Sequence, residues 1–398
     1  MKAADVMALE KQYILQTYKR PPFVLSHGRG CWVYDSEERK YLDASSGIAV
    51  SALGHQNYYI VEAIKYAADG LLHTSNLYYT QPQAELARAL CESCDMADKV
   101  FFTNSGTEAN EGALKFARKW ARAQGYEAKT GLVAFTGSFH GRTMGALSLT
   151  ATAKYRTPFE PLVAESYFAE YNNLDSAAQV INDHTCGVIV EPVQGEGGVT
   201  PATAEFLAGL RELCNKHNAL LIFDEVQCGL GRTGTLWAHQ DYEVNPDMMT
   251  IAKPLGGGLP IGAILVNEKV ATVMQPGDHG STFAGGPFVC SVANSVLYHI
   301  NDDKFLIHVK LVGHHLHRKL EKLVAQSPLL ESVRGRGLMW GVVTKIPAVE
   351  IMAEAYNHGL LVLVAGEKVL RILPPLIIKE HEVDELIERL QATLEAVG

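Results

Sequence analysis

The chain has 398 residues, with 35 Lys plus Arg against 44 Asp plus Glu, and its formal net charge is −9 with histidine neutral. Hydrophobic residues make up 47% and charged residues 20%, which is an ordinary globular composition and excludes disorder and collagen-like repeats. Nucleic-acid binding requires a clustered basic face, which the sequence lacks, so we expect no nucleic-acid partner.

The first fifty-odd residues predict an arm and part of a small domain. An amphipathic stretch lies near Val6–Tyr18, and the turn residues and Val, Tyr and Trp of Gly28–Tyr41 predict a hairpin. No apolar run approaches the ~18 residues that span a bilayer, and the N-terminus has neither a signal-peptide core nor an Arg/Ser-rich transit segment. We therefore expect a soluble intracellular protein without a membrane partner. Its compartment is the cytoplasm or, if a transit peptide was removed, a mitochondrial or plastid matrix.

From Tyr59 onward, helix-period segments alternate with short β-rich apolar runs, which is typical of a mainly parallel sheet covered by helices. Helices are expected between the strands, for example over Glu108–Ala123 and Ala204–His217. The runs predicted as strands are Lys99–Thr103, Gly131–Phe135, Gly187–Val190, Ala219–Phe223, Met248–Ile251 and Gly262–Val266. The fold class is therefore α/β.

Past Phe288 the pattern changes to that of an α+β terminal domain. A long helical stretch is followed by predicted strands and a closing helix, over Val333–Thr344, Leu360–Val364, Leu370–Ile372 and Glu380–Ala396. We expect an arm with part of the small domain over 1–57, a large domain over 58–287 and the C-terminal small domain over 288–398.

The seven cysteines are an odd number and predict no disulfide framework, which favours a reducing compartment. Cys91 and Cys94 have CxxC spacing, but no second ligand pair lies at zinc-site distance. His314, His315 and His317 fall in a polar helical segment and are read as a solvated face. No metal site is predicted.

Three chemically informative residue sets follow predicted strands, at the sheet edge where open α/β proteins bind ligands. Ser105, Gly106 and Thr107 precede a helix, where they fit either an N-cap or an anion site. Asp224 ends an apolar strand, and a carboxylate there is costly unless a cation pairs with it. Lys253 enters a glycine-rich loop, where desolvation would make its amine a nucleophile toward carbonyls.

Together these sets match pyridoxal 5′-phosphate, which needs a phosphate site, a carboxylate at its ring nitrogen and a lysine amine at its aldehyde. Here the chain resembles the class III, ω-type aminotransferases of the fold-type I pyridoxal-phosphate enzymes. The resemblance covers nearly the whole chain and implies a mainly parallel seven-stranded sheet sandwiched by helices, with a small α+β domain from both termini. It rests on Asn104–Asn110, Phe139–Thr143, Glu191–Gly198, Asp224–Gln227, Lys253 and Gly280–Phe283.

The resemblance also implies roles for single residues. Lys253 is expected to bind the cofactor aldehyde and to move the proton, and Asp224 to hold the ring nitrogen. The other expected cofactor contacts are Gln227 at the ring oxygen, Phe139 stacked on the ring, Gly106 and Thr107 at the phosphate, and Ser105 and Val226 beside them. Thr282 is expected at the phosphate, and Ser281 near the substrate, of the neighbouring subunit, which implies an obligate homodimer with shared active sites.

Three residues are expected to choose the small-molecule substrates. By the resemblance, Arg142 binds the carboxylate far from the reacting amine, and Arg371 binds the α-carboxylate of glutamate. A substrate that reacts through a terminal amine has no carboxylate near the cofactor, so Arg371 would be left unpaired. By the same resemblance, Glu196 is expected to pair with Arg371 in that half-reaction and to yield to glutamate in the other.

One position distinguishes close relatives. Ornithine δ-aminotransferases share most of these motifs but carry a tyrosine where this chain has Ile48, and a tyrosine can hydrogen-bond a free α-amino group whereas Ile48 cannot. We therefore predict transfer of the terminal amine of N2-acetyl-L-ornithine to 2-oxoglutarate, as in arginine biosynthesis. The alternatives are ornithine, succinylornithine and 4-aminobutyrate, an aminomutase, which would lack Arg371, and a silent vitamer-binding protein, which would lack Lys253 or Asp224.

Overall fold

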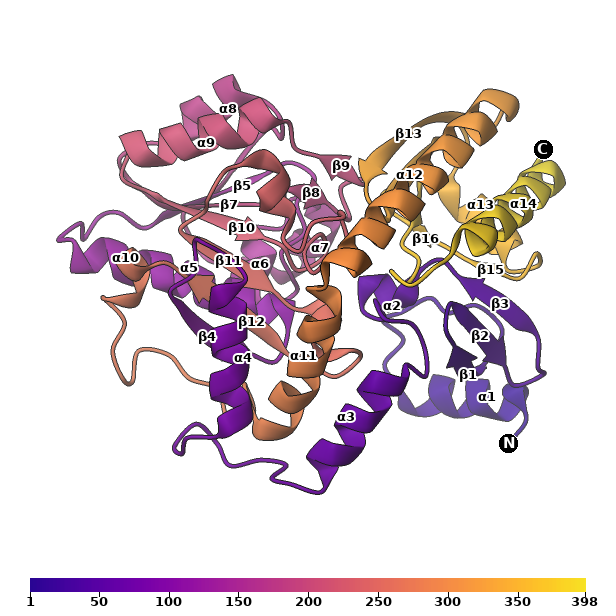
Figure 1. The fold of residues 1–398 in the computed structure, drawn as a ribbon. Coiled ribbons are helices and arrows are strands. Elements are labelled where there is room, and N and C mark those ends of the chain that lie inside the picture. The colour runs from indigo at the N-terminus through magenta and orange to yellow at the C-terminus, as the bar shows by residue number, and fades with distance from the viewer.

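A twisted sheet of seven strands is the core of one of the two parts of the computed structural model, which describes residues 1–398 (Figure 1). The strand order is β4-β12-β11-β10-β7-β5-β6, and every neighbouring pair is parallel except the two that involve β12. The strands are β4 Lys99–Thr103, β5 Gly131–Phe135, β6 Ser166–Ala169, β7 Thr185–Val190, β10 Leu220–Asp224, β11 Met248–Ile251 and β12 Gly262–Val266.

Helices cover both faces of this sheet because its buried strands send alternate side chains to opposite sides. Leu132 and Ile222 pack in a core with α5, whereas their neighbours Val133 and Leu221 pack in a second core with α9. The mainly parallel α/β/α sandwich that the sequence predicts is confirmed. The helices of this part are α4 Gln81–Glu92, α5 Gly106–Ala123, α6 Met144–Ser148, α7 Ala153–Arg156, α8 Leu174–Val180, α9 Ala204–Lys216 and α10 Glu268–Ala271.

The direction of the strands decides where the site lies. Because β4, β10 and β11 run parallel, their carboxyl ends reach the same edge of the sheet. β12 runs antiparallel between β11 and β4, so a loop over residues 252–261, which contains the η3 turn Lys253–Gly256, connects β11 to β12 without a crossover helix. Ser105, Asp224 and Lys253 are thereby gathered at one edge.

The two ends of the chain form the other part of the molecule, where they share one sheet, and the C-terminal segment alone builds a second (Figure 1). In the first sheet the C-terminal strand β15 pairs in parallel with the N-terminal strand β3. The strands of the two sheets are β1 Leu25–Arg29, β2 Trp32–Asp35, β3 Lys40–Asp43 and β15 Leu360–Leu361, and β13 Leu330–Arg336, β14 Met339–Thr344, β16 Leu363–Val364 and β17 Val369–Ile372. Their helices are α1 Ala3–Tyr13, α12 Asp303–Gln326, α13 Ala348–Ala355 and α14 Glu380–Val397.

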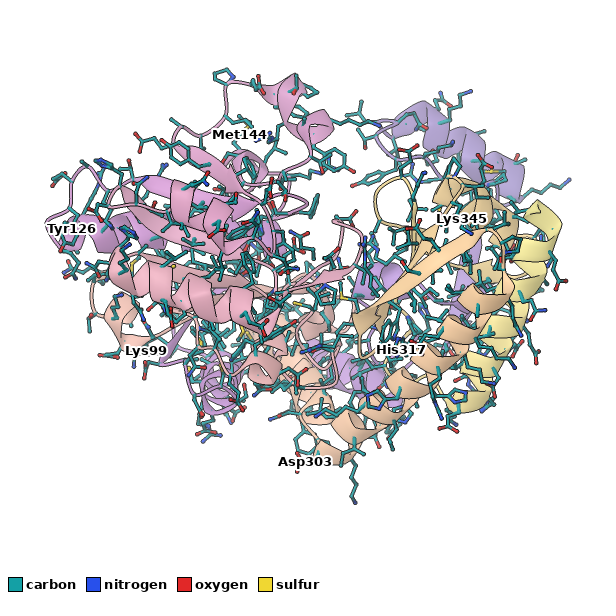
Figure 2. The ribbon with its side chains drawn as sticks, turned by 90° about the horizontal axis from the view of Figure 1, so that it is seen from above. Lys99, Tyr126, Met144, Asp303, His317 and Lys345 are labelled. Atoms are coloured by element: carbon teal, nitrogen blue, oxygen red, sulfur yellow. The ribbon has the colours of Figure 1, made fainter.

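Seen from above, Lys99, Tyr126 and Met144 lie in the part built on the seven-stranded sheet, and His317 and Lys345 lie in the part built from the chain ends (Figure 2). The remaining helices, α2 Ser46–Ala49, α3 Tyr58–Ala68 and α11 Pro287–Ile300, lie between or beside these parts, and α11 packs against α3 and α4. No helix combines the length and apolar character needed to cross a membrane. The residue limits of the domains stay a prediction.

Three local expectations need correction. The expected hairpin is a three-stranded antiparallel unit, β1–β2–β3. The single long helical stretch past Phe288 is two helices, because Asp302 caps α12 by accepting from the Phe305 amide at 3.0 Å. The edge strand β6 was not among the predicted strands, because it is only four residues long and only one of its side chains is buried.

Candidate active site

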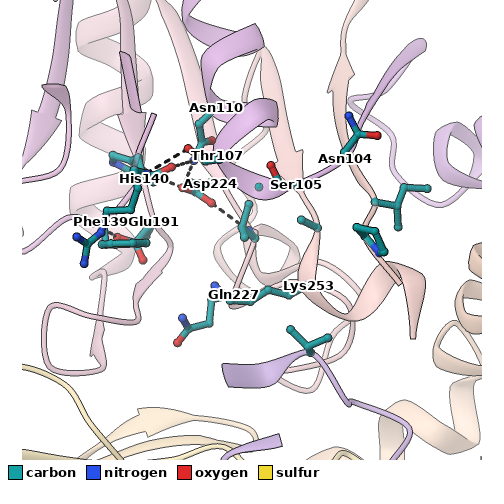
Figure 3. Close-up of a pocket in the computed structure, with 18 of the residues that line it drawn as sticks. Asn104, Ser105, Thr107, Asn110, Phe139, His140, Glu191, Asp224, Gln227 and Lys253 are labelled. Atoms are coloured by element: carbon teal, nitrogen blue, oxygen red, sulfur yellow. Dashed lines mark hydrogen bonds and ion pairs between the residues drawn. The ribbon is translucent and has the colours of Figure 1, made fainter. Parts of the chain in front are cut away.

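A cavity of about 480 Å³ opens at the carboxyl edge of the seven-stranded sheet (Figure 3). Its walls come from the loops after β4, β5, β7, β10 and β11. Of the residues predicted for the site, its lining includes Ser105, Gly106, Thr107, Phe139, Arg142, Glu196, Asp224, Val226, Gln227 and Lys253. Arg371, Ser281 and Thr282 are absent from the lining.

The N-terminus of α5 forms one wall. Ser105 is the N-cap, and its hydroxyl accepts from the Glu108 amide at 3.3 Å. A Cβ on Gly106 would lie 2.6 Å from Val226 Cγ1, so only glycine allows this close packing. The first N–H groups of an α-helix have no intrahelical partner and, with the helix dipole, attract anions. The N-cap is therefore confirmed, and the anion site stays a prediction at a helix end that lines the cavity.

Asp224 lies buried at the end of β10 within a network of donors. Its Oδ2 accepts from Asn110 Nδ2 at 2.8 Å and lies 2.7 Å from His140 Nδ1, while its Oδ1 accepts from the Val226 amide at 3.0 Å (Figure 3). Sequence reasoning missed both His140 and Asn110 as partners. Each lies within a motif that the resemblance covers, but no spacing rule places either side chain against a strand more than 80 residues away.

Lys253 follows β11 and points into the cavity. Burial lowers the pKa of its amine, and the nearby carboxylate of Asp224 opposes that shift. The backbone of Lys253 has φ of 25°, a positive value that costs energy in a residue with a side chain. Such strain often accompanies a functional position, and here it aims an amine of weakened basicity at the ligand space.

Phe139 and Glu191 lie together on the opposite wall (Figure 3). Glu191 Oε1 accepts from the Phe139 amide and Glu191 Oε2 from the Gly195 amide, both at 3.0 Å. Burial, the largest cause, raises the pKa of the Glu191 carboxyl to about 7, and His140 opposes the shift. Glu191 had no predicted role, although it begins the Glu191–Gly198 motif.

Arg371, on β17, reaches toward the cavity from the terminal part of the molecule. Its Nη1 lies 2.7 Å from Glu196 Oε1 and donates to Gln227 Oε1 at 3.2 Å. Its Nε is buried without a partner. The guanidinium is thus held by one carboxylate and one amide, and part of its hydrogen-bonding capacity is unused.

Arg142 lies exposed at the cavity, where its guanidinium is 3.6 Å from the centre of the Tyr155 ring. No carboxylate forms an ion pair with it within 4.0 Å, so it is not a structural salt bridge. Ile48, in contrast, does not line the cavity, whereas Val50 does. Residues 46–49 form a turn with positive φ throughout, and Ile48 is held there at 64°.

Ser281 and Thr282 line a separate hollow beside Asn76. The Asn76 side chain donates to the Ser281 carbonyl at 3.2 Å, and Asn104 Nδ2 donates to Ser281 Oγ at 3.0 Å. Within one chain, this loop therefore touches the rim of the cavity through Asn104 without entering it.

The other sequence features take structural partners. His315 lies 2.8 Å from Asp384 Oδ1, and the His317 ring stacks on Trp340. Cys94 Sγ lies 3.7 Å from His239 Nε2, and no group of three His, Cys, Asp or Glu residues is arranged to hold a metal. Burial raises the pKa of the Cys228 thiol well above its usual value, which keeps it protonated and unreactive.

These residues fit pyridoxal phosphate. The cavity joins a helix N-terminus, a buried carboxylate with its own donors and a lysine whose amine is partly desolvated. Phosphate, ring nitrogen and aldehyde each require one of these three groups. The packing of Gly106 against Val226 further keeps side-chain atoms off the helix end.

Comparisons with known proteins agree with this site. The family model "Aminotransferase class-III" matches residues 13–394. The mitochondrial acetylornithine aminotransferase of Alnus glutinosa is 50% identical over 99% of this chain and 88% of its own. Among solved structures, ornithine aminotransferase of Toxoplasma gondii has TM-score 0.95 at 31% identity over 100% and 96% of the two chains, and N-acetylornithine aminotransferase of Stenotrophomonas maltophilia has TM-score 0.85 at 37% identity over 98% of each.

The chain therefore belongs to the class-III aminotransferases. It is a pyridoxal-phosphate-dependent transaminase of fold type I, as the sequence analysis predicts.

Proposed function

We propose that this enzyme moves the terminal amino group of N2-acetyl-L-ornithine to 2-oxoglutarate, giving N-acetyl-L-glutamate 5-semialdehyde and L-glutamate. This reaction belongs to arginine biosynthesis. The observation that carries the proposal is the Arg371–Glu196 pair at 2.7 Å, with an unpaired Arg142 elsewhere on the cavity wall. The names of the relatives at 43% to 50% identity support it.

We assign the chemistry to three groups of the chain. Lys253 would hold the cofactor through its amine and, once released, would move the proton at the substrate carbon, since burial lowers the pKa of that amine. Asp224, ordered by His140 and Asn110, keeps the ring nitrogen protonated. When bound, pyridoxal phosphate supplies an electron sink for the carbon that loses its proton.

Cofactor position depends on the remaining wall residues. The amides of Gly106 and Thr107, next to Ser105 and Val226, bind the phosphate at the α5 N-terminus. Phe139 would contact the cofactor ring and Gln227 would hold its ring oxygen. Both assignments come from the family resemblance, and the presence of both residues in the cavity lining supports them.

Substrate choice follows from two arginines. Arg142 binds the distal carboxylate of either substrate, because its guanidinium has no carboxylate partner in the chain. Arg371 binds the α-carboxylate of glutamate. While acetylornithine reacts, Glu196 stays paired with Arg371, and a buried cation without a partner is thereby avoided.

The second candidate substrate is ornithine, because solved ornithine aminotransferases share the whole fold. The same arginines would bind it. Ile48 opposes ornithine because its side chain offers no hydrogen bond to a free α-amino group. Its placement outside the cavity of its own chain means that this contrast acts at the entrance or across a subunit boundary.

A half-reaction titration tests the substrate. The absorbance of the bound cofactor is followed after mixing with acetylornithine, ornithine, succinylornithine or 4-aminobutyrate in the absence of an oxo acid. We expect acetylornithine to have the highest kcat/KM. A higher value for ornithine would overturn the assignment, while a colourless protein that ignores added pyridoxal phosphate would overturn catalysis altogether.

We also propose a homodimer whose active sites use Ser281 and Thr282 of the other copy. The loop 71–79 and Phe283 expose large apolar side chains at one place, joined through the His73–Phe283 ring contact at 5.1 Å. Exposed apolar side chains gathered in this way are typical of an interface. They are Leu71, Leu72, Leu77, Tyr78, Tyr79 and Phe283.

Sedimentation velocity measures the mass in solution. The wild type is expected to be a dimer, and Leu77→Glu to dissociate and to lose cofactor affinity because Thr282 is removed with the partner. Tyr167→Glu, at an exposed position on the edge strand β6, is the control that should remain dimeric. A monomeric wild type with full activity would refute the shared site.

The domain limits and the cellular compartment are two further proposals. We propose that the domains divide near residues 57 and 287, which limited proteolysis would test by the position of its first cuts. The mitochondrial name of the Alnus glutinosa relative supports an organelle matrix or the cytoplasm as the compartment. A fluorescent fusion to the C-terminus would locate the protein, and secretion would contradict the proposal.

A further inference from the structure

Glu191 joins two loops that carry different parts of the substrate site. One loop follows β5 and carries Phe139 and Arg142, and the other follows β7 and carries Gly195 and Glu196. The carboxylate uses one oxygen for each loop, accepting from the amides of Phe139 and Gly195 at 3.0 Å. Both contacts are to the backbone, so the carboxylate fixes chain position and not merely side-chain rotamers.

The two loops also touch directly. A Cβ on Gly197 would lie 2.5 Å from the Gly137 carbonyl, and Gln194 Nε2 donates to the Thr136 carbonyl at 2.8 Å. Gly195 also lies close to the side-chain amide of Gln227, since a Cβ on Gly195 would be 2.3 Å from Gln227 Oε1. Any shift of Gly195 therefore moves the backbone next to Glu196.

The contact between Glu191 and the Gly195 amide affects the ion pair between Glu196 and Arg371. Glu196 is the residue directly after Gly195, and its carboxylate reaches Arg371 from there. If the Gly195 amide loses its acceptor, the backbone that presents Glu196 is less ordered, and the pair with Arg371 forms less often. The loop of Arg142 loses one anchor at the same time.

We propose that Glu191 is a positioning residue that sets the pairing of Glu196 with Arg371 by holding the Phe139 and Gly195 amides. It thereby sets the ratio of the affinities for substrates with one carboxylate and substrates with two. This inference rests on the proposed function of the same site. It adds a residue that neither binds substrate nor reacts but decides how readily Glu196 leaves Arg371. We call the Glu196–Arg371 pair the gate, which is closed when the two side chains are paired and open when Arg371 is free.

Two unreactive probes separate the two states of the gate. N-acetyl-L-norvaline has the carboxylate of acetylornithine but no terminal amine, so it needs Arg371 covered. Glutarate has two carboxylates and needs Arg371 free. Titration calorimetry on the holoenzyme gives both Kd values, and the ratio of Kd for N-acetylnorvaline to Kd for glutarate reports the position of the gate without any turnover.

For Glu191→Gln we expect this ratio to rise about tenfold at pH 8.5, because the amide can accept from only one of the two backbone N–H groups. The matched control is Tyr171→Phe. The Tyr171 hydroxyl donates to the Glu191 backbone carbonyl at 2.7 Å and leaves the carboxylate alone, so the ratio should change less than twofold. A ratio that stays within twofold of wild type in Glu191→Gln would overturn the proposal.

The wild-type protein supplies a second test, which does not depend on whether a variant folds. Burial raises the pKa of the Glu191 carboxyl to about 7, so at pH 6 it is largely protonated and one oxygen becomes a donor facing an N–H group. The wild-type ratio should therefore approach that of Glu191→Gln at pH 6, and it overturns the proposal if it does not move. The titratable groups that face Glu191 are His140, Asp224, Lys253, Tyr171 and Cys228.

These results are independent of the test of function. If acetylornithine turned over slowly but the Kd ratio still shifted in Glu191→Gln, acetylornithine would be rejected as the substrate and the role of Glu191 would stand. Fast turnover with an unchanged ratio would keep the substrate and reject the role of Glu191.

Discussion

Replacing Glu196 by glutamine removes the charge that faces Arg371, and the two half-reactions should respond in opposite directions. The pair is 2.7 Å long, with 3% of the Arg371 side chain and 28% of the Glu196 side chain exposed. Removing one partner of a fully buried pair costs about 3–5 kcal/mol. Because Glu196 is partly exposed and Gln227 still accepts from Arg371, we expect a smaller cost, about 1–2 kcal/mol.

With acetylornithine, this cost appears as weaker binding, since Arg371 then faces an uncharged chain. With glutamate, the substrate carboxylate no longer has to displace Glu196, so binding improves by a similar amount. The ratio of the two kcat/KM values should therefore shift by about 2–4 kcal/mol in favour of glutamate, which is about 30- to 1,000-fold.

Stopped-flow mixing with each substrate alone measures both half-reactions through the absorbance of the bound cofactor. Glu212→Gln, at an exposed position on α9, makes the same change of charge away from the cavity and should leave the ratio unchanged. If Glu196→Gln alters both half-reactions by the same factor, the reasoning about the Arg371 gate is refuted.

Three further outcomes are expected. Gly106→Ala places a Cβ 2.6 Å from Val226 and should weaken cofactor binding at least about tenfold, measured by fluorescence titration of the apoenzyme; unchanged affinity would mean that the helix end does not hold the phosphate. Arg142→Ala should raise KM for both substrates by about 10- to 100-fold and leave the ratio of their two kcat/KM values nearly unchanged. An effect on only one half-reaction would contradict a shared distal site. Burial opposes ionisation of His239, but its contacts with Cys94 and Glu225 outweigh burial and raise its pKa to about 10, so its stabilising effect is complete below the unfolded pKa near 6.5 and is lost as pH rises through 10. In urea unfolding, the difference between wild type and His239→Gln should therefore shrink from pH 6 to pH 10, and a constant difference would contradict a charged pair.

Much of the site could be predicted because it depends on local pattern and strand direction. Apolar runs locate β4, β10 and β11 to within about one residue, and the rule that parallel strands end at one edge gathers Ser105, Asp224 and Lys253. The motif resemblance adds the family, which the comparisons confirm. These inferences need no knowledge of any distance.

What the sequence by itself determined was the fold class and the cofactor, and it predicted which groups react, because periodicity and residue chemistry are local properties. Only the tertiary structure decided which side chains meet. His140 reaches Asp224 from another loop, Glu191 ties two loops through backbone amides, and Arg371 arrives at Glu196 from a different sheet. Such contacts depend on how loops and sheets pack across long separations in the chain, and residue spacing carries no information about that packing.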